Sequence, residues 1–158
     1  MWTDSDVPST EAGESYFGRI ASSGELIGIV SHLGGRWCTS LARTGAGFAV
    51  TCQDVFLLLS PDGSESASIP AEMQLAAVAW DGEQFGIAWP DYRDGNYEIY
   101  FLARSPDGAA LGTDLRVTHT PDGSGGPSMV ALAGTFAVSW EDVVASGHEV
   151  FFARFGCP

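Results

Sequence analysis

Four short motifs recur in a fixed order along the chain, and this repetition constrains the fold more than any other feature. The first motif is an aromatic residue or a cysteine, then any residue, then Asp. Its copies begin at Trp2, Cys52, Trp89 and Trp140, which are 50, 37 and 51 residues apart. Repeats of this length indicate one supersecondary unit that stacks on copies of itself.

The other three motifs keep their order around the first. A lead-in with Phe at its start precedes three of the copies, at 48–51, 85–88 and 136–139. An acidic residue with an apolar run follows each copy, at 14–19, 54–57, 98–101 and 149–154. A turn containing Gly comes next, at 22–24, 60–63 and 105–108. A closing segment completes the unit, with 29–32 matching 116–119.

Each motif segment is short, rich in β-branched and aromatic residues, and bounded by Gly, Pro, Asp or Ser, which is typical of strands and turns. We therefore predict an all-β fold of about thirteen strands. Inner strands are expected at 37–43, 73–80 and 127–132, and second strands at 47–53, 84–90 and 135–141. Third strands are expected at 54–59, 97–104 and 148–155, and outer strands at 25–31, 64–70 and 109–118.

Units of 37 to 51 residues with four short strands have the period of a β-propeller blade. We predict one propeller-like domain over 1–158, with a partial blade at 1–35, blades at 36–71 and 72–120, and an incomplete blade at 121–158. This is a partial propeller of about three four-stranded antiparallel blades, incomplete at both ends. Such a chain would need missing blades from a larger protein, or self-association, to close a ring.

The net charge excludes several partners. The 158 residues carry 7 basic and 20 acidic side chains, a formal net charge of −13. Phosphate backbones would not be neutralised by such a surface, so nucleic acid is not expected as a partner. The longest apolar run, 55–59, is far too short to span a membrane.

One blade resembles the repeat of TolB-like, WD-repeat-like propellers. The segment from Asp81 to Tyr100 has Asp-Gly, an apolar strand, an Asp-Arg-Asp-Gly-Asn loop and then Glu-Ile-Tyr, as that family does. The resemblance implies a propeller used for protein interaction, usually non-enzymatic, in the periplasm or outside the cell. No secretory signal is visible at Met1–Asp4, so this compartment is expected from the resemblance alone.

The loop after Trp89 is the best candidate for a ligand site. Asp91, Tyr92, Arg93, Asp94 and Asn96 offer charged, polar and aromatic contacts on a loop between strands. Oxygen atoms of Asp91, Asp94, Asn96 and Glu98 form a weak calcium candidate, because Arg93 occupies the third position, where an EF-type loop requires an oxygen ligand. Otherwise no cofactor is expected. The alternative is a solvated turn.

The repeated aromatic and acidic residues are expected to be structural rather than ligand-binding. Units with a long loop after the Asp also carry an Arg in the third strand, which predicts coupled Asp–Arg pairs. The residues in this structural repeat are Trp2, Asp4, Arg19, Trp89, Asp91, Arg104, Trp140, Asp142 and Arg154.

The three cysteines leave two arrangements open. Cys38 and Cys52 flank a hairpin loop, and an odd number of loop residues would place them opposite each other. The repeat alignment favours an even loop, which would send them to opposite faces. Cys157 is unpaired in either case.

These features predict a binding module without catalysis, with a protein or carbohydrate partner held by loops at one end of the blades. The alternative is a sialidase-like or other glycoside hydrolase fragment. A convergent pair of carboxylates or a cluster of arginines in a central cleft would favour that alternative.

Overall fold

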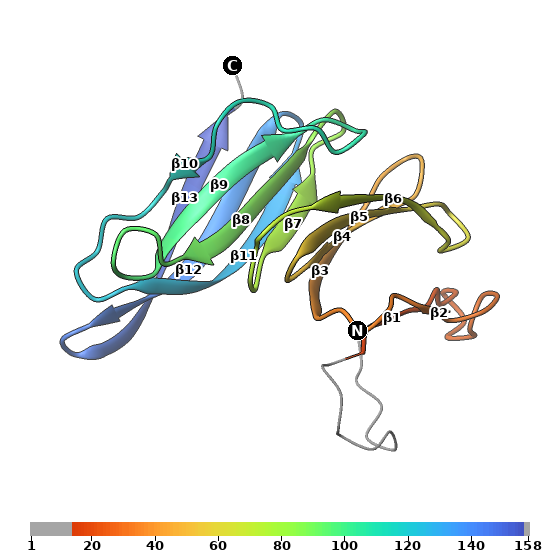
Figure 1. Ribbon diagram of the computed structural model, residues 1–158, viewed down its shortest axis with the longest axis horizontal. Helices are drawn as coiled ribbons and strands as arrows, with labels where there is room; N and C mark the ends of the chain where they lie inside the picture. The colour runs from red at the N-terminus through yellow and green to blue at the C-terminus, as the bar shows by residue number, and fades with distance from the viewer. Residues whose placement is uncertain (1–13, 157–158) are drawn as a thin grey trace.

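A computed structural model describes residues 14–156, which form thirteen strands and no helix (Figure 1). The first sheet pairs β1 (Tyr16–Phe17) with β2 (Ser31–His32). The second contains β3 (Cys38–Arg43), β4 (Phe48–Cys52), β5 (Val55–Leu59) and β6 (Glu65–Pro70). The third contains β7 (Ala77–Trp80), β8 (Phe85–Asp91), β9 (Glu98–Arg104) and β10 (Leu115–Arg116). The fourth contains β11 (Ser124–Leu132), β12 (Thr135–Val144) and β13 (Gly147–Gly156).

Every sheet is antiparallel, and its strands lie in the order in which the chain forms them. The all-β prediction is confirmed, and the inner, second and third strands of the last three units lie within a few residues of their expected positions. The fourth sheet ends at β13 without an outer strand in the described residues. No helix within residues 14–156 is long and apolar enough to cross a bilayer.

The outer strands are shorter than predicted where glycine takes a left-handed conformation. The expected strand at 109–118 is reduced to β10 and one bridge between Arg104 and Ala110, because Gly112 has a φ of +93°. The expected strand at 25–31 is likewise interrupted by Gly28, at a φ of +75°. A residue with such a φ departs from the extended conformation and interrupts regular strand pairing.

Successive sheets pack through phenylalanine rings at each junction. Ring centroids of Phe17 and Phe48 lie 4.8 Å apart, those of Phe56 and Phe85 lie 5.3 Å apart, and those of Phe101 and Phe136 lie 5.5 Å apart. In each pair, a strand of one sheet supplies the first ring and the second strand of the next sheet supplies the other. These distances are typical of favourable aromatic pairs.

Strand register shows which residues are equivalent in different sheets. Phe56 lies opposite Thr51, Phe101 opposite Ala88, and Phe152 opposite Ser139. Thr51, Ala88 and Ser139 each precede the aromatic or cysteine residue of the first motif. Phe56 therefore corresponds to Phe101, not to Tyr100 as the order of the sequence motifs indicates, because the β4–β5 turn is so short.

Gly86 makes room for the third pair of rings. A Cβ atom on Gly86 would lie 2.6 Å from Cδ1 of Phe136 and 2.9 Å from Cε2 of Phe101, and both rings are buried. The equivalent residue in the second sheet is Ala49, which is also small and fully buried. Small residues on the second strand therefore allow the next sheet to approach closely.

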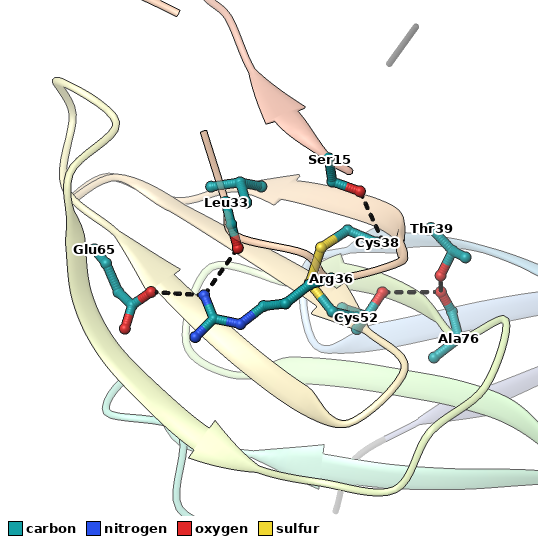
Figure 2. The surroundings of a disulfide bond; sticks show 9 residues. Ser15, Leu33, Arg36, Cys38, Thr39, Cys52, Glu65 and Ala76 are labelled. Atoms are coloured by element: carbon teal, nitrogen blue, oxygen red, sulfur yellow. Dashed lines mark hydrogen bonds and ion pairs between the residues drawn. A yellow bond between two sulfur atoms is a disulfide. The ribbon is translucent and has the colours of Figure 1, made fainter. Parts of the chain in front are cut away.

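A β-bulge brings two cysteines together (Figure 2). Arg43 pairs with Phe48, so the loop between β3 and β4 has an even number of residues, as the repeats indicated. The register then shifts between Cys38 and Ser40, which adds one residue and places Cys38 opposite Cys52. The two cysteines form a disulfide. The expectation that they lie on opposite faces is therefore wrong, and Cys157 lies outside the described residues.

The bulge also joins the second sheet to the third. The hydroxyl groups of Thr39 and Thr51 both donate to the carbonyl oxygen of Ala76, at 2.8 and 2.9 Å. On the other side, the amide of Cys38 donates to Oγ of Ser15 at 3.1 Å. Figure 2 shows Ser15 and Ala76 on either side of the disulfide. The disulfide therefore lies where three consecutive sheets are linked.

We predict that Gly86→Ala destabilises the protein by about 1–3 kcal/mol, because the added methyl group overpacks a junction of rings. Gly125→Ala is the matched control, since a Cβ there meets nothing within 4 Å. Urea denaturation of both variants measures the difference. Equal stability of the two variants would contradict the close packing at Gly86.

Removal of the disulfide should cost up to about 3 kcal/mol, because the bond closes a loop with a sequence separation of 14 residues. The double variant Cys38→Ala and Cys52→Ala should unfold at lower urea concentration than the wild type. Thiol labelling of the denatured wild type without reductant should modify Cys157 alone. Labelling of all three cysteines would contradict the bond.

Candidate binding site

The order of the strands brings two kinds of connection to one end of the sheets: the links between second and third strands, and the links from one sheet to the next. When four antiparallel strands follow one another, the link from the second strand to the third lies at the same end as the link to the next sheet. Figure 1 shows the β8–β9 loop, the β10–β11 connection and the β12–β13 turn projecting to the same side. A pocket of about 310 Å³ lies among them and the β6–β7 loop.

Twelve residues line this pocket, which we call the junction pocket because the third and fourth sheets meet there. They are Gln74, Leu75, Pro90, Tyr97, Asp122, Gly123, Ser124, Gly125, Gly126, Glu141, Val143 and His148. Its volume is at the small end of the range for ligand pockets in proteins.

The apolar part of the junction pocket comes from two connections and from the end of β12. Leu75, Tyr97 and Val143 are 55%, 52% and 44% exposed, so their side chains are open to a ligand. Tyr97 contacts Tyr92 edge-on, with ring centroids 5.1 Å apart. Leu75 has a φ of +53°, which is unusual for a residue other than glycine.

The polar part is acidic. Asp122 and Glu141 line the pocket together with His148, whose Nδ1 atom contacts Oε1 of Glu141. The oxygen atoms of Ser124 and Thr120 lie 3.2 Å apart, within hydrogen-bond distance. The side chains at this rim therefore attract cations and hydrogen-bond donors.

Two backbone hydrogen bonds fix the walls of the pocket. The amide of Ser124 donates to the carbonyl oxygen of Tyr97 at 2.6 Å, and the amide of Val143 donates to that of Gly123 at 3.1 Å. The first joins the start of β11 to the β8–β9 loop, and the second joins the β10–β11 connection to β12. Both walls of the pocket are therefore held by backbone hydrogen bonds within the protein.

A smaller cavity of about 270 Å³ occupies the corresponding position between the second and third sheets. It is lined by Trp37, Thr39, Gln53, Gln74 and Leu75. Gln53 follows Cys52 as Glu141 follows Trp140, so the repeats place equivalent residues at both cavities. Leu75 and Gln74 lie between the two cavities and line both.

The predicted ligand loop forms an ion-pair network beside the junction pocket. The guanidinium group of Arg93 pairs with Asp91 and with Asp114, and its Cζ atom lies 4.2 Å from the ring centroid of Tyr100. The hydrogen bond from Arg93 lowers the pKa of Asp91 to about 2, and Asp91 raises the pKa of Arg93. Tyr100 in turn donates its hydroxyl hydrogen to Asp94.

A second arginine completes the network. Arg116 pairs with Asp94 at 3.0 Å and with Glu98 at 2.8 Å. Glu98 is fully buried, and burial raises the pKa of its carboxyl group. Hydrogen bonds from Thr118, Arg116 and Thr120 outweigh this effect and lower the pKa below its ordinary value. Glu98 therefore stays ionised. Through these hydrogen bonds it holds the chain between β9 and β11 in place.

The network occupies the carboxylates that the sequence suggested as calcium ligands. Two guanidinium groups lie among the carboxylates of Asp91, Asp94 and Glu98, so a metal ion would have to displace them. The side-chain amide of Asn96 donates to Glu98 and to the carbonyl oxygen of Thr120, at 3.1 and 2.6 Å. Within residues 14–156, no group of three acidic, histidine or cysteine side chains could hold a metal ion.

The expected Asp–Arg pairs do not form in the described residues. Arg104 donates to the carbonyl oxygen of Gly108 at 2.7 Å, while Asp91 pairs with Arg93. Arg19 similarly donates to the carbonyl oxygen of Pro61 at 2.8 Å. The arginines hold turns rather than the acidic residues of the repeat, because a carbonyl group of the turn lies within their reach.

The repeated tryptophans occupy different environments. Trp89 is buried, and its Nε1 atom donates to Asp91 at 3.2 Å. Trp140 stacks on Phe151, with ring centroids 6.2 Å apart, and its buried Nε1 atom has no partner. Asp142 is buried, its Oδ1 atom is unpartnered, and it forms no ion pair with Arg154. Trp2 and Asp4 lie outside the described residues.

The predicted site residues thus lie next to the junction pocket rather than in it. Tyr92 contacts Tyr97, but Asp91, Arg93 and Asp94 are bound to one another through the network. Sequence reasoning did not identify Leu75, Tyr97, Asp122, Glu141, Val143 or His148 as site residues. The repeats contained the necessary signal, because the strand order places the links at 71–76, 92–97, 117–123 and 145–146 at one end.

Comparison with known proteins gives no family for the chain. No family model matches it, and no curated protein is similar to it. One solved structure, a protein of unknown function from Bacteroides caccae, is similar over 85% of this chain and 66% of that chain. Its sequence identity is 18% and its TM-score is 0.38. This chain therefore spans slightly less than two thirds of that protein.

The low pKa of Asp91 predicts a loss of stability in acid. Its folded pKa of about 2 lies below the ordinary value of about 4, so the stabilisation is present above pH 4 and is lost as the pH falls toward 2. Because Arg93 is partly exposed, Asp91→Asn should cost about 1 kcal/mol at pH 6 and little at pH 2.

Urea denaturation at pH 6, 4 and 2 measures this effect. Arg93→Gln removes the guanidinium group that pairs with Asp91. The loss of stability between pH 4 and pH 2 should then be smaller than in the wild type. If either variant kept the full acid dependence of the wild type, the ion pair would not be its source.

Proposed function

We propose that this protein is a binding module without catalysis, and that the junction pocket receives an apolar side chain of a protein partner. The observation that carries this proposal is a pocket with an apolar wall and an acidic rim at the end of the sheets, whose walls are held by backbone hydrogen bonds. Loops held by a rigid scaffold are a common place for binding residues.

The chemistry of the pocket indicates the kind of segment that fits. A leucine or aromatic side chain can contact Leu75, Tyr97 and Val143, which lie on one pocket. A neighbouring lysine or arginine of the partner can pair with Asp122 or Glu141. The net charge of −13 favours approach of a basic segment over an acidic one.

We also propose that the sheets form part of a β-propeller in a larger assembly. The support is the series of sheets in chain order, with two four-stranded sheets between a two-stranded and a three-stranded one, each joined to the next by an equivalent aromatic pair. Propeller blades have four antiparallel strands and follow one another in this way.

An extracellular or periplasmic location is part of the same proposal. The disulfide between Cys38 and Cys52 supports it, because such bonds persist in oxidising compartments and are rare in the cytosol of most organisms.

A peptide array tests the proposal. The array carries ten-residue peptides with a Leu, Phe or Trp next to Lys or Arg, and the same peptides with Glu in place of the basic residue. We expect micromolar binding to the basic peptides, weakened by salt. Val143→Arg should abolish the binding of basic peptides, because the arginine side chain fills the pocket and repels their positive charge. Leu111→Arg, on an exposed loop outside the pocket, should leave this binding unchanged. Equal binding by the two variants would contradict the site.

One observation favours a glycoside hydrolase as the second candidate. Asp122 and Glu141 line the same pocket, and glycosidases use two carboxylates beside the bond that they cleave. A glycan array and a set of aryl glycosides test this function. Hydrolysis that is lost in Glu141→Gln would replace the binding proposal with this one.

A further inference from the structure

One face of the fourth sheet is exposed, whereas the equivalent face of the third sheet is buried. In strands, alternate side chains lie on the same face, so register identifies which residues share it. Val130 pairs with Ala137, Phe152 with Ser139, and Val150 with Glu141. Val130, Val150 and Phe152 therefore lie on one face, and they are 66%, 79% and 68% exposed.

The equivalent residues of the third sheet are buried by the fourth. Ala79 pairs with Gly86, Phe101 with Ala88, and Ile99 with Pro90, at the same repeat positions. These three residues are 6%, 8% and 0% exposed, respectively. The covering residues include Phe136 and Val138 of β12, which belong to the same hydrophobic clusters as Ala79, Phe101 and Ile99.

Phe152 is thus the fourth member of a series whose first three members each pack on an aromatic ring. Phe17, Phe56 and Phe101 lie 4.8 to 5.5 Å from their partners and are no more than 8% exposed. The exposed face of the fourth sheet continues an interface that the protein forms three times. Exposed apolar clusters of this kind mark interaction surfaces.

The opposite end of the stack is also apolar. Phe17 and Arg19 are directed toward the second sheet, where they contact Phe48 and the carbonyl oxygen of Pro61. Strand alternation places Ile20 on the other face, where it pairs with Leu26. Ile20 and Leu26 are 61% and 51% exposed.

We propose that the exposed face around Phe152 packs against the exposed face around Ile20 of a second copy of this chain. Two copies joined head to tail in this way bury both apolar ends, and the two contacts are related by a twofold axis. The second copy is the occupant because the molecule exposes a pair of apolar ends, one at each end of the stack.

Light scattering after size exclusion tests this arrangement at 0.15 M salt, between 1 and 200 µM protein. We expect a particle of twice the chain mass of 16.6 kDa. Phe152→Glu and Ile20→Glu should each weaken dimerisation at least ~100-fold, since a charge at the centre of an interface is left unpaired. Leu115→Glu is the matched control, because Leu115 is 52% exposed and lies on neither face.

Mixing the two variants distinguishes this dimer from a symmetric contact of the Phe152 face with itself. Equal amounts of Phe152→Glu and Ile20→Glu chains can form one intact junction, so the mixture should dimerise better than either variant alone. A wild-type monomer at 200 µM would overturn the proposal, as would an Ile20→Glu variant that dimerises like the wild type.

Folding of each variant is checked separately. Far-ultraviolet circular dichroism and retention of the Cys38–Cys52 disulfide, measured by mass spectrometry, show whether the sheets form. If Phe152→Glu does not fold, Phe152→Ser is used, and its dimerisation should still be weakened. A folded Phe152→Ser that dimerises at the wild-type concentration would overturn the proposal.

Discussion

The packing of one phenylalanine on another between consecutive sheets is the interaction on which the rest of the structure depends. Each sheet has two apolar faces and few residues, so it cannot bury both without neighbours. Burial of a phenylalanine contributes about 1.5–3 kcal/mol, and a favourable ring pair adds about 0.5–1.5 kcal/mol. Ala49 and Gly86 keep the backbones close enough for these pairs to form.

This packing sets the distance between sheets and so positions the connections at their ends. The junction pocket exists because residues of three connections meet where the third sheet contacts the fourth. The ion pairs of Arg93 and Arg116 then hold the long β8–β9 loop against β10 and against Asp114, the residue before it. A charged network beside an apolar pocket supports the loop without occupying the space that a ligand needs.

Much of the fold could be predicted from the sequence, because repeated motifs report strand order as well as strand type. The positions of β4, β8 and β12 followed from the lead-in that begins with Phe. Features that depend on a shift of strand register by one residue could not be predicted. The bulge at Thr39 places Cys38 directly opposite Cys52 instead of on the other face of the sheet. No repeated pattern in the sequence indicates this bulge.

The candidate site was harder to predict than the fold for a similar reason. The loop at 91–98 is rich in polar groups, but Arg93 of the loop and Arg116 of β10 satisfy them within the protein. No sequence motif, in contrast, distinguishes the pocket residues. Leu75 and Val143 become site residues only because different repeats bring them together.

The junction pocket belongs to the boundary between two repeats, and this has a consequence for how such a protein can change. A row of stacked repeats has one boundary fewer than it has repeats, and gaining a repeat by duplication adds a whole boundary at once. The cavity lined by Trp37 and Gln53 and the pocket lined by Tyr97 and Glu141 are two such boundaries with different side chains. Each can diverge toward its own ligand while the strands that support it stay the same. Two weak contacts at neighbouring boundaries would then act on one extended partner as a single strong one.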